Sequence, residues 1–349
     1  MTSRVFSRLD GPVTFKLPVQ ALGVLAALVG LTGMIAVASL MTGSYPLDMA
    51  GALAALFGTP PSEMAETVVW QFRFPRTLAA ILAGALLALS GATLQNVTRN
   101  PLADPSLVGV SQGAGLAVVT AIVVFPELPQ ALRPVLGFVG ALGVAALIQS
   151  ITGRRAGGAT MRFILTGIGV AAFLSAATSA LLTYGQIDRA ISALGWLAGS
   201  VHAANWTDVA VLGAGLLLLA PALFAASRPM AAMRFGPDVA AGLGVRVGRT
   251  RLGLVTLSVA LAAVAVAMVG PIGFVGLVAP HLARRLTYSG VGLHLTLSAA
   301  VGALLVGAAD LAGRALFAPI QLPAGVVTAV VGAPVFVLLI LRTQARAHL

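Results

Sequence analysis

Long apolar runs separated by short polar segments fill most of this chain. A helix needs about 20 mostly apolar residues to cross the hydrocarbon core of a bilayer. By that measure the run at 272–286, the eighth along the chain, is short. It contains Pro280 and His281, so we expect a broken or re-entrant segment there. We interpret the first run as an uncleaved helix, because it is too long for a signal-peptide core. The pattern predicts about ten membrane helices, at 17–40, 77–97, 106–125, 134–152, 163–184, 208–226, 252–270, 272–286, 291–315 and 323–341.

Charged residues sit between the apolar runs and not along one face of a helix. They make up only 9% of the chain, against about a quarter in soluble domains. Placing both termini in the cytoplasm puts sixteen of the 21 basic residues on the inner side, as the positive-inside rule requires. The tail 1–16 and the segment 227–251 then face the cytoplasm. The sequence predicts one membrane domain over 1–349, in a multi-pass protein of the cytoplasmic (inner) membrane that meets lipid and not nucleic acid.

Several chemistries are excluded by residue type. The chain has no cysteine, which excludes disulfides and thiolate metal sites. Its one lysine, Lys16, lacks the neighbours of a phosphate-binding loop. If ATP and magnesium are used, we expect a partner subunit to bind them. No catalytic, cofactor or metal constellation is evident, so we expect a protein that is not an enzyme.

Ionisable residues inside the apolar runs are functional candidates by default. Asp310 has Arg314 four residues later on the same helix face, which is consistent with a proton relay or, as we favour, a local ion pair. His281 is consistent with proton transfer or metal binding, but a lone histidine more often caps or kinks a helix end. His202, His294 and His348 show no grouping in the sequence.

The stretch RNPLADPSLVGVSQGAG (99–115) joins two apolar runs. Its prolines and glycines end one helix and begin another, and the residues alone leave open whether it is a gate or only a well-capped turn. The stretch strongly resembles the loop after the second helix in FecCD-type permeases. Five further segments match that family in order: WQFRFPRTLAAILAGALLALSGATLQ (70–95), LGWLAGS (194–200), VGPIGFVGLVAPHLARR (269–285), ADLAGRAL (309–316) and LPAGVVTAVVGAPVFVLLILR (322–342).

The resemblance implies an all-α, type II ABC importer permease of about ten helices. Such a permease forms a homodimer, or a heterodimer with a related permease, with the transport pathway along the subunit interface. A cytoplasmic ATPase dimer binds beneath it and an extracytoplasmic substrate-binding protein docks on top. The expected cargo is a ferric siderophore, with haem or cobalamin as the alternative. An ion-coupled secondary transporter that depends on Asp310 is the rival class, and a membrane enzyme is more remote.

The resemblance also assigns roles to residues on both sides of the membrane. It implies a cytoplasmic gate at Asn100 and Leu102, with Thr160 and Met161 in the turn before the fifth span. Arg73, Arg76 and Arg314 would receive acidic side chains of the binding protein, although anchoring of a helix or pairing with Asp310 also accounts for them. Family members often have an acid where this chain has Gln321.

A short helix is predicted inside the segment 227–251, from Pro237 to Leu243. Proline suits a first helical position, an acid suits the first turn, and Gly244 would end the helix. The resemblance implies that the segment 227–251, through its stretch MRFGPDVAAGLGVRVGR (233–249), is the coupling segment, which sits in a groove of the ATPase; the alternative is an ordinary basic loop. The residues concerned are Pro237, Asp238, Ala240, Ala241, Gly242, Leu243 and Gly244.

Overall fold

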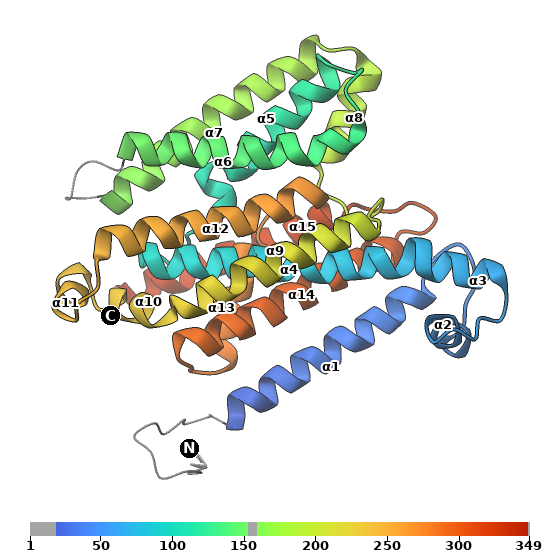
Figure 1. Ribbon diagram of the computed structural model, residues 1–349, viewed down its shortest axis with the longest axis horizontal. Helices are drawn as coiled ribbons and strands as arrows, with labels where there is room; N and C mark the ends of the chain where they lie inside the picture. Colours follow the sequence, from blue (N-terminus) through green and yellow to red (C-terminus); the bar gives the residue numbers. More distant parts are fainter. Residues whose placement is uncertain (1–18, 153–158, 348–349) are drawn as a thin grey trace.

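The computed structural model describes residues 19–152 and 159–347, and these form helices joined by short loops (Figure 1). The predicted tail 1–16 lies outside the described residues. The α-helices are α1 (Val19–Met41), α2 (Met49–Leu56), α3 (Glu63–Thr67), α4 (Phe74–Thr98), α5 (Val110–Val123), α6 (Arg133–Thr152), α7 (Ala159–Tyr184), α8 (Ile187–Leu197), α9 (Trp206–Ala225), α10 (Ser227–Met233), α11 (Pro237–Gly242), α12 (Val247–Val269), α13 (Val275–Leu286), α14 (Val291–Ala315) and α15 (Ala324–Ala347).

Each of the ten predicted spans coincides with one helix. Seven helical segments in the described part of the chain are long and apolar enough to cross a membrane, and two more, Val110–Val123 and Ala324–Leu338, are shorter apolar helices. The eighth predicted span is α13, which has only 12 residues and contains Pro280, as its short apolar run predicted. The hydropathy pattern missed α2 and α8, because neither is long enough to register as a span.

Helix α4 lies in the middle of the bundle and packs against α14, α12, α13 and α9 (Figure 1). In its most apolar stretch 83% of the residues are buried, compared with 6% for α1 and 11% for α7. Helices α5 to α8 form a group on one side, joined to the rest largely through contacts of α6 with α12. Helix α1 lies along the opposite edge. The bundle therefore has one enclosed helix and two lightly covered flanks.

Glycines let α4 approach its neighbours closely. A side-chain carbon on Gly84 would fall on the Gly302 carbonyl oxygen of α14, and one on Gly302 would fall on that of Gly84. Gly91 faces Gly276 of α13 in the same way. Small residues at helix crossings allow backbones to meet where lipid supplies no hydrophobic drive between helices. The Gly- and Ala-rich composition of this chain is used at these crossings.

The chain is unwound just before α13. Gly270 takes a positive φ of 72° and residues 270–274 are not helical. The Ser200 amide donates to the carbonyl of Val269, the last residue of α12, at 2.8 Å, and beside the break the Gly325 amide donates to the Gly199 carbonyl at 2.9 Å. Irregular backbone at membrane depth is tolerated where the protein itself satisfies it.

Candidate functional site

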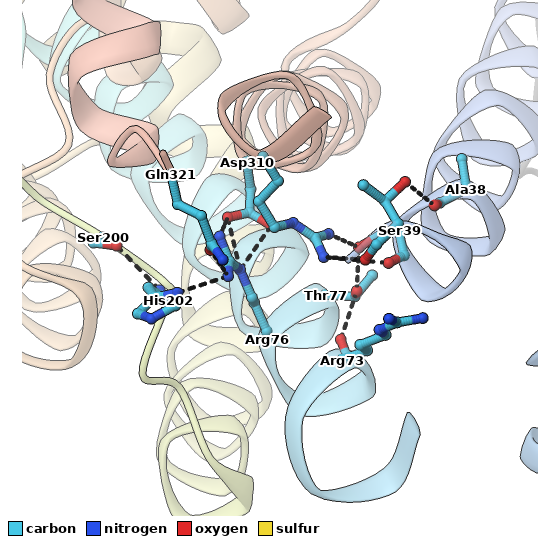
Figure 2. Close-up of polar contacts among 11 residues, drawn as sticks. Ala38, Ser39, Arg73, Arg76, Thr77, Ser200, His202, Asp310 and Gln321 are labelled. Atoms are coloured by element: carbon cyan, nitrogen blue, oxygen red, sulfur yellow. Dashed lines mark hydrogen bonds and ion pairs between the residues drawn. The ribbon is translucent and has the colours of Figure 1, made fainter. Parts of the chain in front are cut away.

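One group of ionisable side chains links three helices at the Arg76 end of the bundle. Asp310 of α14 receives Arg76 of α4 in a two-pronged contact, with Nε 3.0 Å from Oδ1 and 3.1 Å from Oδ2, and Nη2 2.8 Å from Oδ1. Nη1 of Arg76 contacts the Gln321 Oε1 and the His202 Nδ1, each at 2.8 Å. Figure 2 shows these side chains converging from separate elements. We call Arg76, Asp310, Arg314, His202 and Gln321 the outer cluster.

Arg314 and Arg73 also donate hydrogen bonds to residues at the end of α1. The Arg314 Nε lies 3.3 Å from the Asp310 Oδ2, while its Nη atoms donate to the Ser39 hydroxyl and to the carbonyls of Ser39 and Thr42. Arg73 donates to the carbonyls of Leu40 at 2.7 Å, Met41 at 3.3 Å and Tyr45 at 2.5 Å. The last carbonyls of a helix have no partner within it, so these arginines satisfy the end of α1.

The three predicted docking arginines are therefore buried and engaged inside the chain. Arg73, Arg76 and Arg314 are 5%, 6% and 6% exposed. The sequence suggested Arg314 as the partner of Asp310, and that pair is present, but Arg76 makes the closer contact. Docking through these arginines stays a prediction. In this arrangement an incoming carboxylate would have to replace Gln321 or His202 at Arg76.

At the opposite end of α4, side-chain hydrogen bonds to the backbone shape the loop 99–109. Arg99 ends the helix in a left-handed conformation, with φ 52°. The Asn100 Oδ1 accepts the Leu102 amide at 2.9 Å, closing a local turn. Asp104 caps the short 3₁₀ helix Pro105–Val108 by accepting the Ser106 amide at 2.7 Å. The backbone of Thr160 and Met161 lies in the first turn of α7, but their side chains lie outside the described residues.

Asp104 is 5% exposed and lies against the start of α13, where a side-chain carbon on Gly276 would come within 3.0 Å of its Oδ2. Burial raises the pKa of the Asp104 carboxyl above its ordinary value, and hydrogen bonds from Ser106 partly oppose the rise. Sequence reasoning did not single out Asp104. The loop is thus tied to the broken helix as well as to α4.

The predicted coupling helix is present as α11, Pro237–Gly242, one residue shorter than expected. Gly236 precedes it with φ 111°, and Gly244 follows with φ 82°, both accessible mainly to glycine. Asp238 lies in the first turn, and only Ala240 is buried. Most of the surface of α11 is therefore exposed. Its role in coupling stays a prediction.

The histidines group in ways that the sequence did not reveal. His202 joins the outer cluster, and His294 of α14 lies beside Arg284, with Nε2 3.4 Å from its Nε. His281 accepts from the Arg285 Nε at 3.0 Å, one turn along α13. Among residues 19–152 and 159–347, no group of three or more His, Cys, Asp or Glu could hold a metal ion. The partners of His202 and His294 lie on other helices, so these two contacts depend on helix packing, which the sequence pattern does not show.

The comparisons with known proteins agree with the fold. The model of the FecCD transport family matches residues 31–342. YfhA of Bacillus subtilis (strain 168), by its name a siderophore transport system permease protein, is 40% identical over 327 residues, 92% of this chain and 95% of the relative. The achromobactin transport system permease protein CbrC of Dickeya dadantii (strain 3937) is 40% identical over 309 residues, 88% of each.

A solved structure extends the agreement to three dimensions. A protein described as a metal-chelate type ABC transporter, in an inward-facing conformation, has a TM-score of 0.80 and 30% identity, covering 92% of this chain and 99% of its own. This chain, a multi-pass membrane protein, therefore belongs to the FecCD transport family.

Proposed function

We propose that this chain is the permease subunit of an ATP-driven importer for ferric siderophores in the cytoplasmic membrane. The observation that carries the proposal is the family match over residues 31–342, together with relatives whose names specify siderophore transport. Haem or cobalamin, bulky chelates like a siderophore, is the alternative cargo. The outer cluster argues against a secondary transporter, because both oxygens of Asp310 contact arginines and leave no open site for a coupling ion.

The energy source lies outside this chain. Because this chain has no phosphate-binding loop of the GxxxxGK[ST] type, we assign ATP hydrolysis to a cytoplasmic ATPase dimer that binds ATP and magnesium. The exposed helix α11 supports a contact with that partner, since packing within its own chain buries only one residue of this short helix and so stabilises it little. Deleting Ala240–Gly244 should leave the permease folded and uncouple ATP hydrolysis from import. Normal import by the deletion variant would refute the assignment.

The pathway is proposed to run between two permease protomers, identical or related. Helix α7 supports this arrangement, because it is long, 11% buried within its own chain, and exposes the small residues Gly169, Ala172 and Ala176. A gate at Asn100 and Leu102 would close the inner end. Each gate must have an open and a closed state, and the binding of nucleotide to the ATPase must shift the equilibrium between them.

A binding protein is proposed to dock at the opposite end, over the outer cluster. We expect Arg76 to contact the binding protein directly, while Arg73 and Arg314 stabilise the surrounding backbone through their hydrogen bonds to the end of α1. Charge reversal at Arg73 or Arg76 should weaken docking, measured as binding of the cognate binding protein to permease in nanodiscs. Arg133→Gln, outside the cluster, is the control. Unchanged docking and transport would contradict this role.

Transport itself decides between the two classes. Purified permease should import ferric siderophore into proteoliposomes only when the ATPase, the binding protein and ATP are present. The control is the same vesicle with a proton gradient and no ATPase. Uphill uptake in the control would contradict the proposal and favour a secondary transporter.

A further inference from the structure

Four arginines gather at the end of the bundle that carries α11. Arg99 closes α4, and its Nη1 is 3.6 Å from where a side-chain carbon on Gly236 would stand. Gly236 follows Arg234 by two residues and begins α11. Arg251 of α12 interacts electrostatically with Arg99, and Arg284 of α13 does so with Arg234. We call Arg99, Arg234, Arg251 and Arg284 the inner cluster.

Neutral groups hold the inner cluster in place. The Arg284 Nη2 donates to the Gln95 Oε1 at 2.5 Å, and the Gln95 Nε2 donates to the carbonyls of Gly276 and Leu277, each at 3.3 Å. His294, 4% exposed, lies on the other side of Arg284 and also within range of the Arg234 charge. Arg284 is therefore fixed by an amide and an imidazole, and not by a carboxylate.

No ion pair within 4 Å is formed by these arginines in the described part of the chain, and the acid nearest in sequence to Arg234 is Asp238, in the first turn of α11. Both ion pairs in that part of the chain, Arg76–Asp310 and Arg314–Asp310, belong to the outer cluster. The positive-inside rule accounts for arginines in inner loops, but not for four from separate elements meeting without an ion pair. Like charges this close repel one another and focus a positive potential. An anionic surface brought against them would remove that cost.

The position of the inner cluster indicates which anion fits. Arg99 ends α4, the most enclosed helix, whereas lipid reaches only the perimeter of a bundle. Gly236 and Arg234 adjoin α11, which lies at the extreme end of the molecule in Figure 1. A macromolecule approaching that end meets α11 and the arginines together. This favours an acidic protein surface over a lipid headgroup.

We propose that the inner cluster is a second contact with the cytoplasmic ATPase, and receives carboxylates of that partner beside α11. The inference rests on the proposed function and adds a charge requirement to it: the facing surface of the ATPase is acidic. Charged groups at an interface act chiefly on the association rate and its salt dependence. The arginines steer the ATPase, and α11 then engages it.

The test measures ATPase binding to full-length permease in nanodiscs of zwitterionic lipid, at several salt concentrations. Arg234→Gln and Arg99→Gln should each slow association about threefold or more at low salt and flatten its salt dependence, with little change in dissociation. Arg234→Lys, which keeps the charge, should preserve both. Arg133→Gln, which lies outside both clusters and outside the segment 227–251, is the control.

Each outcome separates the inference from the function on which it rests. Glutamine variants that bind the ATPase with the wild-type rate and salt dependence would overturn the inference and leave the proposed function intact. Retention of anionic lipid that depends on these arginines, with unchanged ATPase kinetics, would overturn it in favour of a lipid site. Failure of the wild-type permease to bind any ATPase would instead contradict the proposed function.

Discussion

Arg76 and Asp310 are 234 positions apart in the chain, yet the Arg76 Nη2 lies 2.8 Å from the Asp310 Oδ1. The contact ties the start of α4 to the end of α14. Because Arg314 joins Asp310 to the end of α1, one carboxylate organises three helices at the same end of the bundle. Removing one charge from such a buried group leaves the others uncompensated.

Asp310→Asn should be strongly destabilising. It leaves Arg76 and Arg314 facing each other without an anion, and loss of one partner from a buried pair costs about 3–5 kcal/mol. Thermal unfolding in detergent is the measurement, with Asp188→Asn on the exposed face of α8 as the control. If Asp310→Asn unfolds at the wild-type temperature, the outer cluster does not stabilise the packing of α1, α4 and α14.

Arg73→Gln should loosen the segment after α1 without unfolding the bundle. The variant loses the hydrogen bonds to the carbonyls of Leu40, Met41 and Tyr45. Unsatisfied buried acceptors cost about 1–3 kcal/mol each, so local opening becomes easier. Hydrogen exchange at residues 40–46 should speed up by tenfold or more, and exchange in α12 should not change. Equal acceleration in both would point to global unfolding.

Gly84→Ala should disrupt the crossing of α4 and α14. Its methyl group would fall on the Gly302 carbonyl oxygen, so the helices must separate. We expect a loss of about 1–3 kcal/mol, typical of overpacking. Gly23→Ala in α1 is the matched control, because nothing lies within 4 Å of its added carbon. Similar thermal stability of the two variants would show that the crossing is not tight.

Asp104→Asn should change stability in a pH-dependent way. Burial raises the pKa of the Asp104 carboxyl in the folded chain, so the charged form destabilises the fold above that pKa. As the pH falls below the raised value, the folded wild-type chain takes up a proton and that cost declines, and it is gone below the pKa of the unfolded chain. The asparagine variant carries no such charge at any pH.

The difference in melting temperature between Asp104→Asn and wild type should therefore shrink as the pH falls. Asp188→Asn serves again as the control, because its carboxyl is exposed. Melting curves between pH 4.5 and pH 8.5 check the prediction. A difference that stays constant or grows toward acid pH would contradict it.

The sequence by itself determined where the membrane helices lie, although their ends differ from the predicted ones by several residues, as at α12 (predicted 252–270, observed Val247–Val269). Apolar length decides whether a segment crosses a bilayer, and this is a local property, so all ten predicted spans coincide with helices. The local rules for Pro237, Asp238 and Gly244 likewise predicted α11 to within one residue. Family resemblance over six ordered motifs predicted the fold that the structural match confirms.

Apart from the pair Asp310–Arg314, which the spacing suggested, only the tertiary structure decided which of these polar side chains meet. The resemblance implied that Arg73, Arg76 and Arg314 receive acidic side chains of a binding protein, and the packing of α1, α4 and α14 buries them against Asp310 and the carbonyls at the end of α1. His294, which showed no grouping in the sequence, lies beside Arg284, and Gln95 holds that arginine from α4. Such contacts depend on how helices from distant parts of the chain pack and rotate about their axes, and hydropathy carries no information about either.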